Sequence, residues 1–237
     1  MSLGAPLPAL PLLLELGATI KIAGFDTHDH QAIIDELGAL VDGAPERAVP
    51  KRRAEFLAGR WAARQALAAL GVDGTPGRNE DGSPRWPAQT TGSITHGADR
   101  ALSVAARVTD VRSLGIDAER LMKDSVSTEL RARICVEEEL LLLQRGLGQP
   151  QHHEVTFAFS AKESLYKCLH PLVGKFMDFR AARVVEARWQ GEARARRGEL
   201  TLELTCDWSG EFPKGRLFQA QFSASERHVE SAVVLLA

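Results

Sequence analysis

Few features of the sequence point to a membrane, a nucleic acid or an oxidising compartment. The three cysteines, Cys135, Cys168 and Cys206, are odd in number, far apart and without a CxxC pair. This favours a reduced, cytoplasmic protein with buried thiols. The formal net charge is only −2 over 237 residues, so no global attraction to nucleic acid or to an anionic membrane is expected. Any bound anion must therefore meet a local basic cluster.

Long hydrophobic runs and glycine-rich nucleotide signatures are also missing. The apolar stretch PLPALPLLLELG is too short and too broken by proline to span a bilayer. It also lacks the basic segment that opens a signal peptide, so we expect an N-terminal arm that packs onto the body. Neither a P-loop nor a GxGxxG motif is present, which excludes the common nucleotide-binding folds as explanations.

What is present is the composition of a globular protein, 44% hydrophobic and 25% charged. The length suits one large domain or two small ones. Patterning predicts an α+β fold with antiparallel sheets. The expected helices cover 51–71 and 127–146, with a third beginning after Ser160. The expected strands cover 17–28, a hairpin at 93–108, 111–121, and four segments within 178–237. The Gly- and Pro-rich segment 73–92 is expected to be loop.

A weak internal repeat predicts how the chain is organised. EFLAGRWAARQAL and AFSAKESLYKCL are both basic helical segments entered after a phenylalanine. Each is followed later by a hairpin that contains serine. The echo predicts two similar α+β halves, 1–112 and 113–237.

The motif GIDAER places two carboxylates two residues apart in an expected strand. Asp117 and Glu119 then project to one face, because side chains alternate along a strand. Adjacent carboxylates repel unless a cation lies between them, and hard oxygen ligands select Mg²⁺, Mn²⁺ or Ca²⁺ rather than zinc. A solvated strand end beside Arg120 is the alternative.

The motif SAKESLYK supplies a carboxylate and two lysines at what we expect to be a helix start, with Ser160 as its N-cap. Glu163 and Lys167 are four residues apart and share a helix face. They form either an exposed ion pair or a third metal ligand beside a cation. Lys162 is unusual so near a helix N-terminus unless an anion binds there.

Basic residues gather in a third segment, KRRAEFLAGRWAAR. Helical spacing brings Arg53 and Arg60, and also Arg52 and Arg60, close to one face, where arginine can grip phosphate with two hydrogen bonds. A solvated helix face is the alternative. The segment GSITHGAD adds Ser93, Thr95 and His96 as donors for a phosphate or ribose. The pairs His28/His30 and His152/His153 lack further spaced ligands and are expected at the surface.

These residue types together describe a site for Mg²⁺ and a polyphosphate nucleotide. The ordered motifs RRAEFLAGRWAARQAL, GSPRWP, GSITHG, GIDAE and FSAKESLYK resemble the Sfp-type 4′-phosphopantetheinyl transferases, in the branch of the enterobactin synthetase D component. The resemblance covers about residues 52–168, and FMDFRAARV extends it. It implies a pseudo-twofold α+β fold with the active site where the halves meet.

The resemblance also implies roles for individual residues. Asp117, Glu119 and Glu163 would hold Mg²⁺ against the coenzyme A pyrophosphate. The phosphates of the adenosine bisphosphate part would be bound by Arg52 or Arg53, Arg60, Thr95, His96 and Lys162. One departure is Asp81, where the family often has a basic residue; Arg78 or Arg85 would then contact the 3′-phosphate.

The implied reaction moves 4′-phosphopantetheine from coenzyme A to a serine of an acyl or peptidyl carrier protein. Glu163 or a metal-held water would be the base, Asp117 would hold the metal, and Lys167 would stabilise the leaving phosphate. The segment PLVGKFMDF is a candidate carrier surface, with core packing as the alternative. We expect a monomer. The rival classes are a Mg²⁺-dependent phosphoesterase or nuclease, and a non-catalytic coenzyme A or carrier-binding module.

Overall fold

The computed structural model describes residues 21–26, 29–41, 43–45, 47–96, 100–147, 153–190 and 196–237. Three predictions fall outside this range: the N-terminal arm, the placement of His28 and His152, and the turn of the 93–108 hairpin. The chain divides into two compact units. One contains the described residues up to Ser113 together with Leu235–Ala237, and the other is Leu114–Val234.

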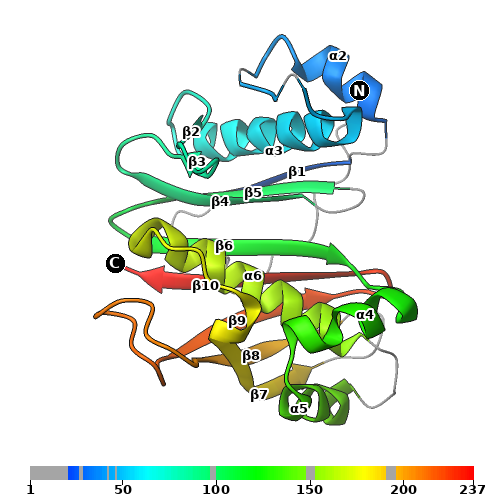
Figure 1. Cartoon of the computed structure of the whole chain (residues 1–237). Helices are drawn as coiled ribbons and strands as arrows, with labels where there is room; N and C mark the ends of the chain where they lie inside the picture. Colours follow the sequence, from blue (N-terminus) through cyan, green and yellow to red (C-terminus); the bar gives the residue numbers. More distant parts are fainter. Residues whose placement is uncertain are drawn as a thin grey trace. The chain divides into compact units, whose positions relative to one another are not determined.

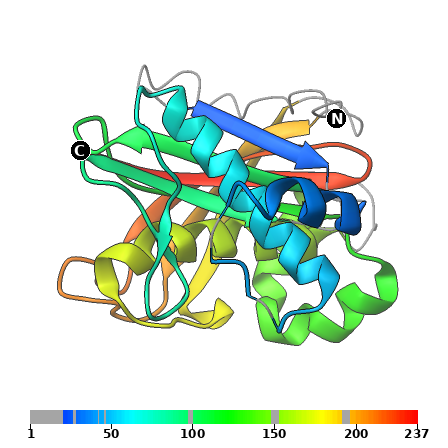
Figure 2. The ribbon, with the colours of Figure 1, turned by 90° about the horizontal axis from the view of Figure 1, so that it is seen from above.

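The first unit is a small antiparallel sheet with helices packed on it (Figures 1 and 2). Its strand order is β1-β5-β4, and helix α3 contacts all three strands while α2 packs against α3. The predicted strand and hairpin are confirmed. The bounds are β1 Lys21–Asp26, α2 His30–Leu37, α3 Pro50–Ala68, β4 Thr90–His96 and β5 Arg100–Arg107.

Helix α3 forms where it was predicted, for reasons visible in its sequence. Pro50 stands in the first turn, where its missing N–H costs nothing. Alanine and leucine then fill the buried side, with Leu57, Ala58 and Leu67 almost completely excluded from solvent. Beyond the last helical residue, Gly71 adopts a φ of 72°, which favours glycine and stops the helix.

The Gly- and Pro-rich segment expected to be all loop contains a two-stranded hairpin, β2 Gly77–Arg78 and β3 Pro84–Arg85. Its turn is held by local bonds: Asn79 N donates to Ser83 O at 2.9 Å, and Ser83 N donates to Asp81 Oδ1 at 2.9 Å. Each strand has only two residues, which is too few to show the alternation of apolar and polar residues by which a strand is predicted.

The second unit is a five-stranded antiparallel sheet of order β6-β10-β9-β8-β7 (Figure 1). Helices α5 and α6 pack on this sheet, and α4 packs against α6. The strand-like tail and the GIDAER strand are both confirmed. The strands are β6 Val111–Arg120, β7 Ala182–Gln190, β8 Arg196–Leu204, β9 Leu217–Ala224 and β10 His228–Leu236, and a short 3-10 turn, η1 Phe179–Ala181, leads into β7.

The prediction of a single helix over 127–146 is wrong. The chain forms two helices, α4 Asp124–Ile134 and α5 Glu137–Leu147. Cys135 breaks the run by adopting an extended conformation, φ −123° and ψ 155°. The Glu139 side chain then accepts a hydrogen bond from Val136 N at 2.9 Å, which satisfies a donor at the start of α5 in the manner of a helix cap.

The predicted start of the next helix is also wrong. Helix α6 spans Glu154–Val173, so Phe157, Phe159 and Ser160 lie inside it. A buried stripe of helical period begins at Val155 and continues through Ala158, Ala161 and Leu165. In the sequence, Phe157 and Phe159 alternate with small residues as in a strand, but the helical stripe of buried residues outweighs this alternation. Ser160 is therefore buried in the helix rather than capping it, and Lys162 stands in the third turn rather than the first.

The observed architecture confirms the α+β class with antiparallel sheets. Within the described residues, no helix is both long enough and apolar enough to cross a membrane.

Candidate functional site

Strand β6 and helix α6 pack closely enough to bring their polar side chains together. A Cβ placed on Gly115 of β6 would overlap the backbone of Ser164 and Cys168 in α6. Only glycine allows this approach without displacing the helix. The glycine of GIDAE thus sets Asp117, two residues further along β6, beside the helix turn that carries Glu163 and Lys167.

Asp117, Glu163 and Lys167 form one electrostatic cluster. Lys167 Nζ donates to Asp117 Oδ1 at 2.6 Å, and the Asp117 side chain is 2% exposed. The pKa of Glu163 is raised, chiefly because burial penalises its charge; Lys167 lowers it and the Asp117 carboxylate raises it. The expected Glu163–Lys167 helix pair is therefore part of a three-residue arrangement in which the lysine contacts Asp117.

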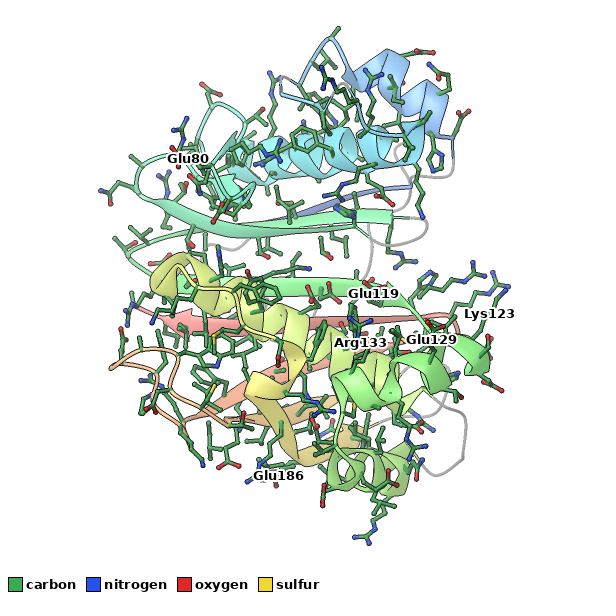
Figure 3. All side chains as sticks on the ribbon, in the orientation of Figure 1. Glu80, Glu119, Lys123, Glu129, Arg133 and Glu186 are labelled. Atoms are coloured by element: carbon green, nitrogen blue, oxygen red, sulfur yellow. The ribbon has the colours of Figure 1, made fainter. Side chains whose placement is uncertain are left out.

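The third predicted ligand, Glu119, lies near the end of β6, where that strand leads into α4 (Figure 3). It is half-buried, and its position two residues after Asp117 gives the two carboxylates one strand face. Among the described residues no three His, Cys, Asp or Glu side chains are spaced as a metal site. The donor chemistry nevertheless fits a hard cation: a divalent ion would offset the burial and the Asp117 repulsion that raise the pKa of Glu163.

Lys162 lies in a buried ion pair. Its Nζ is 2.7 Å from Glu139 Oε1 and donates to Ile134 O at 2.7 Å. The Lys162 and Glu139 side chains are 3% and 2% exposed. The second unit thus gives this lysine two partners at the junction of α4 and α5.

In the first unit, α3 and β4 bring Arg52, Glu55 and His96 together. Arg52 Nη1 lies 2.6 Å from His96 Nε2. The other ring nitrogen of His96 lies 3.7 Å from Glu55 Oε2, which is also 3.8 Å from Arg52 Nη1. An arginine can only donate, so His96 Nε2 accepts and Nδ1 carries the proton toward Glu55. Thr95, the preceding residue, is buried in β4.

A second basic group surrounds the β2–β3 hairpin. Arg60 is buried and donates to Pro76 O at 3.0 Å. Burial, and then the like charge of Arg78, lower the pKa of Arg60 to about 10. Arg85 of β3 pairs with Gly77, next to that carbonyl. The guanidinium groups of Arg60 and Arg78 repel each other, so this position favours a bound anion. The predicted phosphate contacts are of this kind.

The remaining predicted arginine, Arg53, is half-buried on α3. Its Nε is buried without a hydrogen-bond partner among the described residues. A guanidinium nitrogen in that situation retains a donor that a ligand oxygen could accept.

A small pocket adjoins Glu163 in the second unit, lined largely by apolar side chains from α6 and the segment after it. Phe176 is 80% exposed and stacks edge-on with Tyr166 at 5.9 Å between ring centroids. The core-packing alternative for the PLVGKFMDF segment therefore does not hold for Phe176. The lining residues are Lys162, Glu163, Tyr166, Phe176, Met177, Asp178, Phe179, Ala182 and Trp208.

Sequence reasoning missed Glu55 and Glu139. Glu55 is three residues after Arg52 and shares its helix side, a spacing that could have suggested the contact. Glu139 follows two other glutamates, Glu137 and Glu138, and nothing in the run EEE distinguishes the buried one from the exposed ones.

Comparison with known families agrees with the two units. The 4′-phosphopantetheinyl transferase N-terminal domain matches residues 39–106, and the 4′-phosphopantetheinyl transferase superfamily matches residues 113–229. The 4′-phosphopantetheinyl transferase Npt of Nocardia iowensis is 33% identical over 166 residues, 67% of this chain and 70% of Npt. The chain belongs to the 4′-phosphopantetheinyl transferase superfamily.

Other relatives match over a shorter span. Enterobactin synthase component D of Salmonella typhimurium is 44% identical over 117 residues, 49% of this chain and 48% of that protein. The 4′-phosphopantetheinyl transferase Svp of Streptomyces mobaraensis is 40% identical over 138 residues, 56% of this chain and 54% of Svp. The chain thus spans about half the length of the enterobactin synthase components it matches.

Proposed function

We propose that the protein transfers 4′-phosphopantetheine from coenzyme A to a serine hydroxyl of an acyl or peptidyl carrier protein. The serine oxygen would attack the β-phosphorus, and 3′,5′-adenosine bisphosphate would leave. Family membership supports the class of reaction. The grouping of Asp117, Glu163 and Lys167, with Lys167 Nζ 2.6 Å from Asp117, carries the assignment of the site.

The carboxylates of the second unit are suited to a metal-assisted phosphoryl transfer. We assign Asp117, Glu119 and Glu163 as the residues that would hold Mg²⁺. When bound, the ion would neutralise charge on the phosphate oxygens of coenzyme A. Hard oxygen donors are the ligands that Mg²⁺ prefers, which is why a carboxylate set is favoured over the cysteines and histidines of the chain.

Glu163 is the proposed general base. Burial raises its pKa in the metal-free protein. A Mg²⁺ held by the same carboxylate would lower that pKa, so the serine proton would pass to Glu163 or to a metal-held water beside it. Lys167 would place positive charge beside the leaving phosphate and hold the Asp117 carboxylate in position. Both effects lower the barrier by pre-arranged electrostatics rather than by covalent chemistry.

The basic groups of the first unit are the proposed ligands of the adenosine bisphosphate part. Arg52 and His96 would contact its phosphates, with Thr95 beside them. Arg53 and Arg60 extend the positive charge along α3, and Arg78 or Arg85 would contact the 3′-phosphate. Each would raise affinity by charge-assisted hydrogen bonds, which are about twice as strong as neutral ones. Lys162 is left out because Glu139 and Ile134 O already engage its ammonium.

The exposed Phe176 and the apolar pocket beside Glu163 suit an apolar contact with the carrier protein near the reacting serine. An exposed aromatic residue beside a pocket is a common anchor in protein interfaces. A phenylalanine with four fifths of its surface exposed to water has little reason to be there for stability alone.

We propose a cytoplasmic, monomeric enzyme, in keeping with its reduced cysteines.

Intact-mass spectrometry tests the proposal directly. An apo carrier protein is incubated with the full chain, coenzyme A and Mg²⁺, and with EDTA in a parallel reaction. A gain of one phosphopantetheine group that EDTA abolishes is the expected result. Glu163→Ala should lose this activity and keep the native circular dichroism spectrum, while Glu186→Ala, on the exposed side of β7, should retain it.

Three outcomes would overturn the assignment. Full transfer by Glu163→Ala would remove the proposed site. No transfer across several apo carriers, with coenzyme A still bound tightly, would favour a binding module. Release of adenosine bisphosphate without any gain in carrier mass would favour a phosphoesterase.

A further inference from the structure

Lys162 lines the same pocket as Glu163, but the protein itself engages its ammonium, and this suggests another role. Its side chain is almost wholly buried, and its Nζ contacts Glu139 Oε1 and Ile134 O, both at 2.7 Å. These contacts use two of the three N–H donors of the ammonium, and the side chain would have to move away from Glu139 to reach a phosphate in solvent-accessible space. The buried Glu139 carboxylate would then lose its cation, which is strongly unfavourable.

Glu139 joins four segments of the second unit through this one ion pair. Its Oε2 accepts from Val136 N at 2.9 Å, at the start of α5, and its Oε1 accepts from Val184 N of β7 at 2.8 Å. Lys162 adds α6 and the carbonyl of Ile134, the last residue of α4. Each carboxylate oxygen is thus engaged by a backbone donor, and one also by the lysine.

The opposite side of α6 is held by a buried hydroxyl cluster. Ser160 Oγ and Ser164 Oγ each lie 2.8 Å from Ser231 Oγ of β10. Lys162 stands two residues from each serine, which places it about 160° to 200° away around the helix axis. Contacts on opposite faces fix the rotation of α6 about its axis. They therefore fix the direction in which Glu163 and Lys167 project.

We infer that Lys162 and Glu139 are a positioning pair: a buried ion pair that holds α6 so that Glu163 and Lys167 face Asp117. This inference rests on the proposed transferase function. It assigns Lys162 no contact with coenzyme A. A small rotation of α6 would misplace the base and the cation together, and misplacement by about 1 Å can cost about 100-fold in rate.

Four variants of the full chain separate positioning from phosphate binding: Lys162→Met, Glu139→Gln, the double variant, and Lys123→Met as a matched loss of an exposed lysine. The turnover number and the KM for coenzyme A come from carrier modification, and the Kd for coenzyme A from calorimetry. We expect about a 100-fold fall in kcat for Lys162→Met and Glu139→Gln, with KM and Kd for coenzyme A within about threefold of the parent. The double variant should be no worse than the worse single one, because the two residues act as a unit.

Loss of stability needs its own control, since breaking a buried pair lowers Tm. Leu200→Ala removes a buried side chain from β8 in the same unit, and we expect a Tm loss of several degrees with kcat within about threefold of the parent. Glu139→Gln keeps the volume and one acceptor oxygen, so it decides the question if Lys162→Met does not fold.

Three results would overturn the inference. The first is a tenfold or greater rise in the Kd for coenzyme A in Lys162→Met with Glu139→Gln unchanged, which would make Lys162 a phosphate ligand. The second is parental kcat in both single variants. The third is an equal loss of kcat in Leu200→Ala, which would attribute the effect to stability. Failure of the transferase proposal is distinct, because the parent chain itself would then modify no carrier.

Discussion

Lys167 Nζ donates to Asp117 Oδ1 at 2.6 Å, and this contact links α6 to β6 at the proposed site. The lysine is 25% exposed and the aspartate 2%. The cation therefore sits at the rim of a buried carboxylate, where it can both steady that carboxylate and face a bound phosphate.

Replacing Lys167 should separate metal binding from catalysis. Lys167→Met removes positive charge next to carboxylates, so Mg²⁺ should bind no more weakly than in the parent. The leaving phosphate would lose its cation, and we expect kcat to fall by about 100-fold. Carrier modification measured over a range of Mg²⁺ concentrations checks both effects. Restoration of kcat by excess Mg²⁺ would show that the lysine only assists metal binding.

The raised pKa of Glu163 predicts a stability gain when its charge is removed. In the folded state the carboxyl holds its proton to a higher pH than in the unfolded chain, chiefly because it is buried. Folding is thus favoured at low pH, and that advantage is lost as the pH rises from about 4.5 through the raised value.

Glu163→Gln should therefore raise Tm at pH 7 to 8 in EDTA, and the difference should shrink toward pH 4. Thermal unfolding followed by circular dichroism at each pH is the measurement. Glu186→Gln, on an exposed part of β7, should show no such trend. A lower Tm for Glu163→Gln at neutral pH would contradict the predicted direction of the shift.

The cysteines differ sharply in their expected reactivity. Burial raises the pKa of Cys135 to about 12, so almost no thiolate exists at pH 8, and Cys168 is buried as well. Cys206 is exposed. We expect native protein treated with iodoacetamide at pH 8 to gain one adduct on Cys206, and urea-unfolded protein to gain three. Peptide mapping that finds Cys135 modified first would contradict this.

The sequence predicted those parts of the fold whose pattern is local. Helix α3 and the tail strands follow from the spacing of apolar residues, and Gly71 marks where α3 stops. The start of α6 was missed because Phe157 and Phe159 alternate as in a strand, although both lie in a helix. Phe157 contacts Trp189 and Phe222 at 5.4 and 5.2 Å between ring centroids. Because these partners are distant in the sequence, no local pattern could predict the contacts.

The same reasoning explains which site residues were predictable. The spacing within GIDAE places Asp117 on one strand face with a second carboxylate, and the spacing within SAKESLYK places Glu163 and Lys167 on one helix face. These three residues could therefore be selected from the sequence. The burial of Lys162 with Glu139 depends on where α4 ends and α5 begins, a break that periodicity did not reveal. The position of Lys162 next to the proposed base Glu163 predicted phosphate binding, whereas in the structure its Nζ contacts Glu139, 23 residues earlier in the sequence.

Gly115 offers the sharpest test of how β6 and α6 are held together. A methyl group there would overlap the backbone of Ser164 and Cys168, so either the helix or the strand must move. We expect Gly115→Ala to lower the free energy of unfolding by about 1 to 3 kcal/mol, as overpacking does. Because the movement separates Asp117 from Glu163 and Lys167, kcat for carrier modification should fall as well. Gly210→Ala is the matched control: its Cβ meets nothing within 4 Å, and it should leave both quantities close to the parent. Urea unfolding and the carrier assay, run on both variants, decide the matter, and parental behaviour of Gly115→Ala would show that the close approach of α6 to β6 is not required.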